Sequence, residues 1–129
     1  MQFYILTSTD YPALKRHFNY RYSNLQPEDV VVVINTPNLQ YAKLAKSFCE
    51  SKGIEYHVTD SDGTPATGKN AVLDLFLASD NEYCVLVDGD DLLTTHGVWF
   101  YKNLETIDNP PDALFLLNQK SIRFADDVT

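Results

Sequence analysis

The chain has 129 residues, of which 44% are apolar, and it carries eighteen acidic against ten basic side chains. This length favours a single domain over residues 1–129, and the apolar fraction excludes intrinsic disorder as the main description. A net charge of −8 argues against nucleic acid as a partner, and no apolar run approaches the roughly 18 residues of a membrane span.

Segments typical of strands and helices alternate along the chain. The β-branched and aromatic run at 3–9 predicts a strand, and the five branched residues at 30–34 predict a strand covered on both faces. Apolar positions at helical spacing predict an amphipathic helix over 39–52, with Gly53 as its C-cap. The other expected elements are helices at 13–24, 69–79 and 96–107 and strands at 54–59, 83–87 and 113–117. This alternation predicts an α/β fold, a mainly parallel central sheet with helices on both faces.

Three of these segments carry further expectations. Residues 60–68 are rich in Asp, Gly, Thr and Pro, which predicts a loop. The helix at 69–79 is apolar on nearly every side, so we expect it to be well buried. The strand at 83–87 is expected to be fully buried, like the strand at 30–34.

Neither cysteine lies at metal-ligand spacing from the other cysteine or from a histidine. Cys49 and Cys84 both fall in apolar periodic segments, so we expect two buried free thiols in a reducing, cytoplasmic compartment. The histidines are scattered, and surface or packing roles are favoured over metal binding for His17, His57 and His96.

The most distinctive polar motif is Asp88-Gly89-Asp90-Asp91, which directly follows the apolar segment 83–87. In parallel α/β sheets, ligands bind beyond the carboxyl ends of the strands. Along an extended chain Asp88 and Asp90 point to the same side, roughly 6–7 Å apart. Two carboxylates that face one cleft repel each other unless a cation or protons intervene. Hard oxygen ligands of this kind suit Mg²⁺ or Mn²⁺.

A simpler interpretation of the same motif is a turn between a strand and a helix. Gly89 would allow the tight bend, and Asp90 or Asp91 would cap the following helix. The charge around the motif favours the metal site, because six acidic residues and no Lys or Arg lie between Asn70 and Tyr101. Other nucleotide motifs are missing, since the chain contains neither G-x-G-x-x-G nor G-K-[ST].

The order of these pieces resembles the nucleotide-binding half of GT-A type glycosyltransferases, especially the inverting family-two kind. The resemblance rests on three features, which are Thr7 to Tyr11 after the first strand, Gly68-Lys69-Asn70-Ala71 at a helix start, and the run from Val85 to Asp91 with its Asp-x-Asp motif. It covers about residues 2–118. The Rossmann-like donor-binding half of such an enzyme is therefore the expected architecture.

The resemblance implies a role for each acidic residue of the motif. Asp90 would coordinate the divalent cation, Mn²⁺ or Mg²⁺, that bridges the two phosphates of the sugar donor. Asp88 would contact the ribose or help to hold the metal, and Asp91 would support the metal site. The expected partner is a nucleoside-diphosphate sugar, with a UDP-sugar as the favoured donor, and the acceptor is left open.

Three further positions are implied to contact the nucleotide. Lys69, in place of the usual Arg, would reach a base carbonyl or a phosphate. Thr7 and Tyr11 would flank the base, with Tyr11 offering its ring for stacking. In each case a plain structural role remains open, with Lys69 as a helix-start cation and Tyr11 packed on Pro12.

The chain departs from the family pattern in two places. The acidic pair expected after the second strand is replaced by polar residues, so Asn35 or Thr36 could contact the base, or Asp60 or Asp62 could do so from the next strand. The acceptor-binding half is apparently absent, so no catalytic base is assigned, and the chain would be an incomplete or minimal transferase. The alternatives are a non-catalytic binding or assembly module and a nucleotidyltransferase, and homo-oligomerisation is left open.

Overall fold

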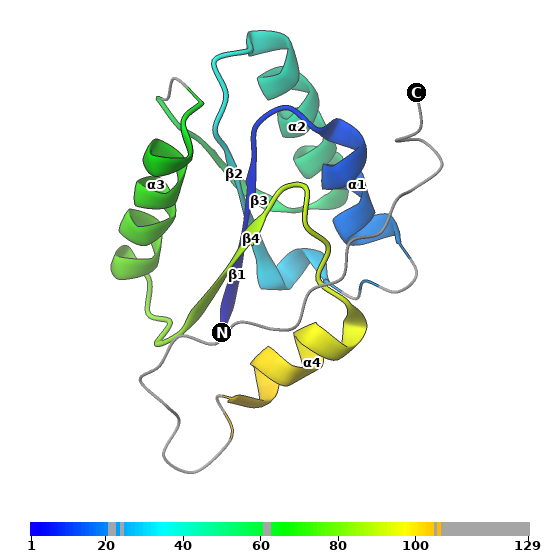
Figure 1. Ribbon diagram of the computed structural model, residues 1–129, viewed down its shortest axis with the longest axis vertical. Coiled ribbons are helices and arrows are strands. Elements are labelled where there is room, and N and C mark those ends of the chain that lie inside the picture. Colours follow the sequence, from blue (N-terminus) through cyan, green and yellow to red (C-terminus); the bar gives the residue numbers. More distant parts are fainter. Residues whose placement is uncertain (21–22, 24, 61–62, 105, 107–129) are drawn as a thin grey trace.

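The structure is a computed structural model that describes residues 1–20, 23, 25–60, 63–104 and 106. Over this part of the chain it contains one all-parallel sheet of order β3-β2-β1-β4, with helices on both faces (Figure 1). The predicted α/β fold class is confirmed. The elements in chain order are β1 (Gln2–Thr7), α1 (Tyr11–Asn19), η1 (Pro27–Asp29), β2 (Val30–Ile34), α2 (Leu39–Lys52), β3 (Glu55–Val58), α3 (Pro65–Ala78), β4 (Cys84–Asp88) and α4 (Thr95–Leu104).

The centre of the sheet is formed by β1 and β2. All five residues of β2 are buried, as the unbroken run of branched residues predicted. Each β2 residue pairs with β1, from Phe3 opposite Val30 to Thr7 opposite Ile34. A strand flanked by two others and covered by helices on both faces has no polar surroundings for either set of side chains, which explains its composition.

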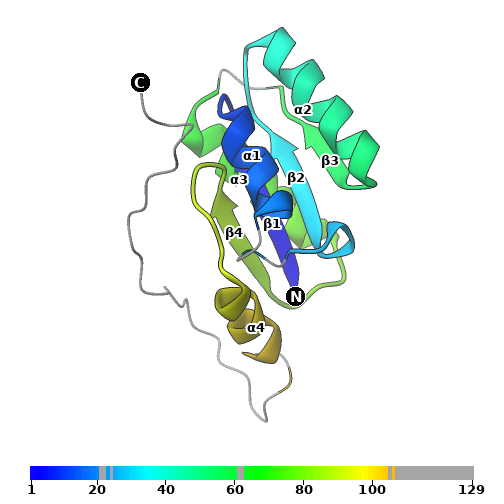
Figure 2. The ribbon, with the colours of Figure 1, turned by 90° about the vertical axis from the view of Figure 1, so that its right-hand side faces the viewer.

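The helices divide unequally between the two faces of the sheet. Helices α1 and α2 cover one face (Figure 2), where Phe3, Ile5 and Val32 belong to the larger hydrophobic core. Helix α3 covers the other face, where Val72 packs with Tyr4 and neighbouring strand residues in a smaller core. Helix α4 lies near the amino ends of the strands (Figure 1). Its Lys102 Nζ donates to Oδ2 of Asp29, the residue that directly precedes β2, at 2.7 Å.

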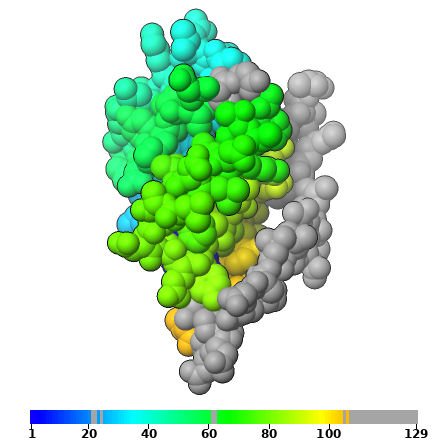
Figure 3. Space-filling model, turned by 90° about the vertical axis from the view of Figure 1, so that its left-hand side faces the viewer, coloured from blue at the N-terminus to red at the C-terminus, as the bar shows by residue number. Residues whose placement is uncertain are grey.

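The burial expected for 69–79 is wrong. Only Gly68 and Val72 of α3 are buried, while the side chains of Leu73 and Leu77 are 51% and 78% exposed. Figure 3 shows α3, in green, on the outside of its face of the sheet. A helix that packs on the sheet by one side alone leaves its other apolar residues in solvent, whatever their number.

The full burial expected for 83–87 is also wrong. Val85 and Val87 are buried, but Leu86 between them is 39% exposed. Among the described residues β4 pairs with β1 only, so it stands at the edge of the sheet, and its alternate residues face the thinner α3 layer. The predicted strand at 113–117 lies outside the described residues.

Several predicted boundaries agree with the structure, and others shift. Helix α2 has the predicted bounds, and Gly53 ends it in the left-handed conformation with φ 68°. Helix α1 starts earlier than predicted, because the Asp10 carboxylate accepts from the backbone N–H of Ala13 and caps it. Helix α3 begins within the predicted loop, at Pro65, since proline is favoured in the first turn of a helix.

Both cysteines are free thiols. Cys49 is buried, and burial raises its pKa to about 11, so the thiol is protonated at neutral pH. Cys84 is only half-buried, at the start of the edge strand, so burial is confirmed in full for Cys49 alone. None of the helices in the described part of the chain has the length and apolar character needed to cross a membrane.

Candidate functional site

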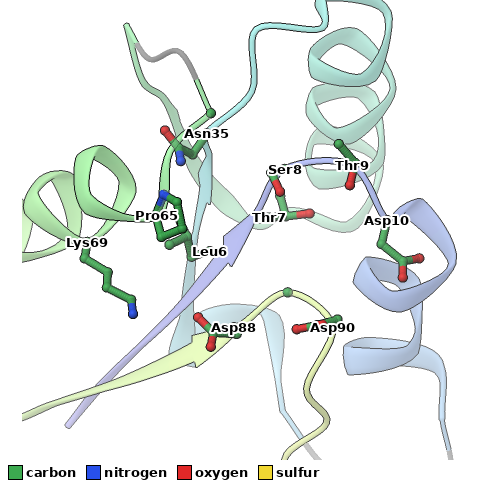
Figure 4. A pocket seen from close by; sticks show the side chains of 12 residues that line it. Leu6, Thr7, Ser8, Thr9, Asp10, Asn35, Pro65, Lys69, Asp88 and Asp90 are labelled. Atoms are coloured by element: carbon green, nitrogen blue, oxygen red, sulfur yellow. The ribbon is translucent and has the colours of Figure 1, made fainter.

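The strand order creates a switch point between β1 and β4. After β1 the chain adds β2 and then β3 on one side of it, and β4 returns to the opposite side. The connections on either side of such a point diverge and leave a crevice beyond the carboxyl ends of the strands. A cleft of about 390 Å³ lies at this position (Figure 4). Its walls are Leu6, Thr7, Ser8, Thr9, Asp10, Asn35, Gly63, Pro65, Lys69, Asp88, Gly89 and Asp90.

Most of the site residues predicted from the sequence meet at this cleft. Thr7, Asn35, Lys69, Asp88 and Asp90 come from four separate stretches of the chain and all line it. The predicted residues that do not line it are Tyr11, Thr36, Asp60 and Asp91, and the predicted Asp62 lies outside the described residues.

The acidic turn is fixed against the end of β1. Asp91 donates its backbone N–H to the Asp88 carbonyl at 3.0 Å, which closes the turn. A Cβ at Gly89 would lie 2.7 Å from the carbonyl oxygen of Leu6 and 3.1 Å from Cα of Thr7, so a larger residue does not fit without a shift. Asp88 and Asp90, on either side of this glycine, are exposed, and Figure 4 shows their carboxyl groups directed to the same side.

No described residue forms an ion pair with the two exposed carboxylates of this turn, those of Asp88 and Asp90. The pKa of the Asp91 carboxyl is raised by partial burial and, to a smaller extent, by the negative charges of Asp90 and Asp88. The turn therefore has an excess of negative charge at the mouth of the cleft.

The protein groups around the turn would supply only part of a metal coordination shell. No set of three His, Cys, Asp or Glu side chains in the described part of the chain is placed to hold a metal ion. Mg²⁺ commonly takes one or two carboxylates from a protein and completes its shell with water and substrate phosphates. Asp88 and Asp90 fit that mode of binding, in which the second half of the shell belongs to the ligand.

Lys69 provides the positive charge on the opposite wall. It is exposed, lies in α3, and is the only basic residue among the described residues that line the cleft. Helix α3 approaches the sheet closely here, because a Cβ at Gly68 would lie 2.7 Å from both Asn35 Nδ2 and Leu6 Cδ1. The glycine thus sets the distance between the lysine and the ends of the strands.

Asn35 has a structural role at the base of the cleft. Its side chain is 2% exposed, its Nδ2 donates to the Thr64 carbonyl at 3.0 Å, and its Oδ1 accepts from Thr59 Oγ1 at 2.9 Å. The amide group therefore ties the end of β2 to the segment after β3 and to the start of α3. The predicted contact with a base has to compete with these two bonds.

Thr7 and Tyr11 also engage other parts of the protein. The buried Thr7 hydroxyl hydrogen-bonds the Tyr41 hydroxyl of α2, so this hydroxyl already has a partner within the protein. The Tyr11 ring packs edge-on against Phe48 with centroids 6.0 Å apart, and Lys15 Nζ lies 4.7 Å from the Tyr11 centroid. The structure thus places Tyr11 in the core side of α1 and leaves Asp60 exposed outside the cleft.

The sequence pattern indicated the segment from Thr7 to Tyr11 after β1, but it assigned no role to the three residues between them. Ser8, Thr9 and Asp10 line the cleft beside the acidic turn, although Asp10 already caps α1 through its contact with Ala13 N at 3.0 Å. The position directly after the first strand, where ligands bind in this class of fold, indicated the segment, whereas the fold decides which of its residues line the cleft.

His17 reaches the acidic turn from α1. It is 0% exposed, and its Nε2 lies 3.1 Å from the carbonyl oxygen of Gly89. Burial lowers the pKa of His17, against smaller opposing effects of the Gly89 carbonyl and the Asp90 charge. His17 is thus buried, while His57 and His96 are exposed, in agreement with the prediction that the three histidines lie apart in the core or at the surface.

Comparison of the chain with protein-family models, with curated proteins and with solved structures finds no match.

Proposed function

We propose that the chain binds a nucleoside-diphosphate sugar through Mn²⁺ or Mg²⁺ at this cleft, as the donor-binding domain of a GT-A type glycosyltransferase. The observation that carries the proposal is the placement of Asp88 and Asp90 at the carboxyl end of β4, next to the switch point. Neither carboxylate has an ion-pair partner among the described residues. The resemblance of the motifs to the family-two pattern supports the same assignment.

The charge of the cleft argues for a cation between protein and diphosphate. Among the described residues, Asp10, Asp88 and Asp90 line the cleft against one lysine, so a bare diphosphate would meet net repulsion from them. A divalent ion held by Asp88 and Asp90 would cancel the negative charges of these two carboxylates and so remove most of that repulsion. It would also neutralise the charge that develops on the departing nucleoside diphosphate during glycosyl transfer.

The chain's own residues would divide the remaining tasks by position. Lys69 on the far wall would attract the phosphates or a base carbonyl, and the hydroxyls of Ser8 and Thr9 would offer hydrogen bonds near the end of β1. If transfer occurs, an acceptor hydroxyl attacks the anomeric carbon and loses its proton to water, and the bond from that carbon to the phosphate oxygen breaks with its electron pair going to the nucleoside diphosphate.

Thermal-shift and calorimetric titration of the full chain with UDP, GDP, CDP and ADP, each with and without Mn²⁺, tests the proposal. We expect a metal-dependent rise in Tm with one nucleotide, UDP being favoured, and loss of that rise in Asp90→Asn. The matched control is Asp80→Asn, an exposed acid in the loop that precedes β4 at the other end of the sheet. That variant keeps the wild-type response.

Three outcomes separate the candidate functions. Binding together with hydrolysis of the matching sugar nucleotide supports a transferase domain. Binding without turnover of the donor, even with sugar acceptors present, assigns a non-catalytic binding module. No response to any nucleotide at millimolar concentration removes the nucleotide-binding proposal.

A further inference from the structure

The turn that carries the two carboxylates is enclosed between β1 and α1. On one side Gly89 rests against Leu6 and Thr7, where even a Cβ atom would be too close. On the other side the buried ring of His17 contacts the Gly89 carbonyl oxygen through Nε2 at 3.1 Å. This contact links residues 72 positions apart in the sequence. Gly89 is thus in contact with both elements, with Leu6 and Thr7 of β1 and with His17 of α1.

The geometry determines which nitrogen of His17 carries the proton. A carbonyl oxygen only accepts hydrogen bonds, so Nε2 must be the donor and the neutral ring has its lone pair on Nδ1. The described residues offer no hydrogen-bond partner to Nδ1, which is fully buried. An unpartnered polar atom in a core is unfavourable, and an apolar side chain would fill the space without that cost. The hydrogen bond to the Gly89 carbonyl is therefore the one interaction among the described residues that His17 makes and that an apolar residue at position 17 could not make.

We propose that His17 is a positioning residue that fixes the Asp88-Gly89-Asp90 turn in its cation-binding arrangement, an assignment that rests on the proposed function. The Gly89 carbonyl belongs to the peptide unit that joins Gly89 to Asp90, one of the two peptide units between the carboxylate-bearing residues. Rotation of this peptide changes the direction of Asp90 relative to Asp88. A donor buried in α1 prevents that rotation and keeps both carboxyl groups on one side of the turn, as Figure 4 shows them.

Two substitutions separate positioning from packing. In His17→Gln the terminal amide N–H can take the place of Nε2–H, whereas His17→Leu fills similar space and has no donor. The matched control is His57→Gln on β3, because His57 is exposed and lies 3.7 Å from Glu55 rather than near the cleft. We expect all three variants to fold, and circular dichroism with thermal unfolding checks this.

The first readout is independent of any ligand. Hydrogen exchange of the backbone amides at 89–91 should accelerate about tenfold in His17→Leu, the equivalent of one lost hydrogen bond, and should stay within about threefold of wild type in His17→Gln. Nitrogen-15 NMR of the wild-type imidazole should show the proton on Nε2. A proton on Nδ1, or unchanged exchange in His17→Leu, overturns the assignment, and the NMR measurement remains decisive if that variant does not fold.

The second readout concerns the cation. Titration with Mn²⁺, followed by electron paramagnetic resonance with and without UDP, should show about tenfold weaker binding in His17→Leu and recovery in His17→Gln. Equal loss in both variants, in step with their Tm, would reduce His17 to a packing residue and overturn the proposal. If wild type bound no Mn²⁺, the proposed function would fail, and the exchange data would still decide whether His17 holds the turn.

Discussion

The polar residues on the two sides of the cleft differ in burial and in the number of protein partners that they have. On the β2 side, Asn35 is buried, and both its amide nitrogen and its amide oxygen form hydrogen bonds within the protein. On the β4 side, Asp88 and Asp90 are exposed and have no ion-pair partner among the described residues. Polar groups at the ends of parallel strands therefore fall into two kinds. Those that are buried and satisfied hold the loops together, and those that are exposed and unpaired are free for a ligand.

The largest expected effect lies on the satisfied wall. Asn35→Ala removes the hydrogen bonds to the Thr64 carbonyl and from the Thr59 hydroxyl, each worth about 0.5–1.5 kcal/mol, and leaves a cavity where the buried amide was. We expect the free energy of unfolding, measured with urea, to fall by about 3 kcal/mol. The matched control Asn70→Ala changes an exposed residue of α3 and should stay within about 0.5 kcal/mol of wild type. Equal values for the two variants would contradict the comparison.

Gly89→Ala comes second because it pushes the acidic turn away from β1. The new Cβ would meet the Leu6 carbonyl oxygen at 2.7 Å, and overpacking of this kind costs about 1–3 kcal/mol. We expect a lower free energy of unfolding together with weaker Mn²⁺ binding, since the turn has to move. Wild-type stability with wild-type Mn²⁺ affinity would show that the close approach is not needed.

The pH dependence of stability tests the state of His17, which is buried behind the acidic turn and contacts the Gly89 carbonyl. Because burial lowers the pKa of His17 in the folded state, the unfolded chain binds the proton more readily. Its contribution is fully present above the ordinary histidine pKa of about 6.5 and is lost as the pH falls below that value. The wild type should lose stability between pH 6.5 and 5 relative to His17→Gln, in urea titrations at each pH.

Asp91 titrates in a different window and with the opposite sign. Its raised pKa means that the folded protein holds the proton more strongly than the unfolded chain does. As the pH falls toward 4, protonation of this carboxyl therefore increases the free energy of unfolding. Asp91 thus cannot account for the loss of stability that His17 is expected to cause as the pH falls from 6.5 to 5.

The smallest expected effect on stability lies on the unpaired wall. Asp88→Asn and Asp90→Asn remove one of two neighbouring like charges from exposed positions, so the free energy of unfolding should change by no more than about 0.5 kcal/mol. The same substitutions should weaken Mn²⁺ binding by tenfold or more (about 1.4 kcal/mol), because each removes a charged ligand. Large destabilisation without loss of binding would mean that these carboxylates serve the fold.

Much of this molecule could be predicted from patterns within short stretches of the chain. The bounds of β2 and α2 follow from an unbroken run of branched residues and from helical spacing closed by Gly53. The acidic turn could be recognised because a strand of apolar residues ends directly at Asp88. These features depend on residues that are neighbours in the sequence, so the sequence displays them.

The two errors of burial have a different origin. Helix α3 and strand β4 are as apolar as buried elements, yet Leu77 and Leu86 are exposed. Composition does not reveal how many layers cover an element, since that depends on which strands pair and where each helix packs. The strand at the edge of the described sheet is recognised only once the order β3-β2-β1-β4 is known.

The sequence by itself determined the alternating elements, the parallel α/β class and the position of the carboxylates at a strand end. The tertiary structure decided that Tyr11 packs in the core, that Ser8 and Thr9 line the cleft, and that His17 reaches Gly89 across 72 positions of the chain. The physical reason is range. Periodicity and capping act between residues a few positions apart, whereas strand order and side-chain contacts are set by the packing of distant segments, which no short pattern encodes.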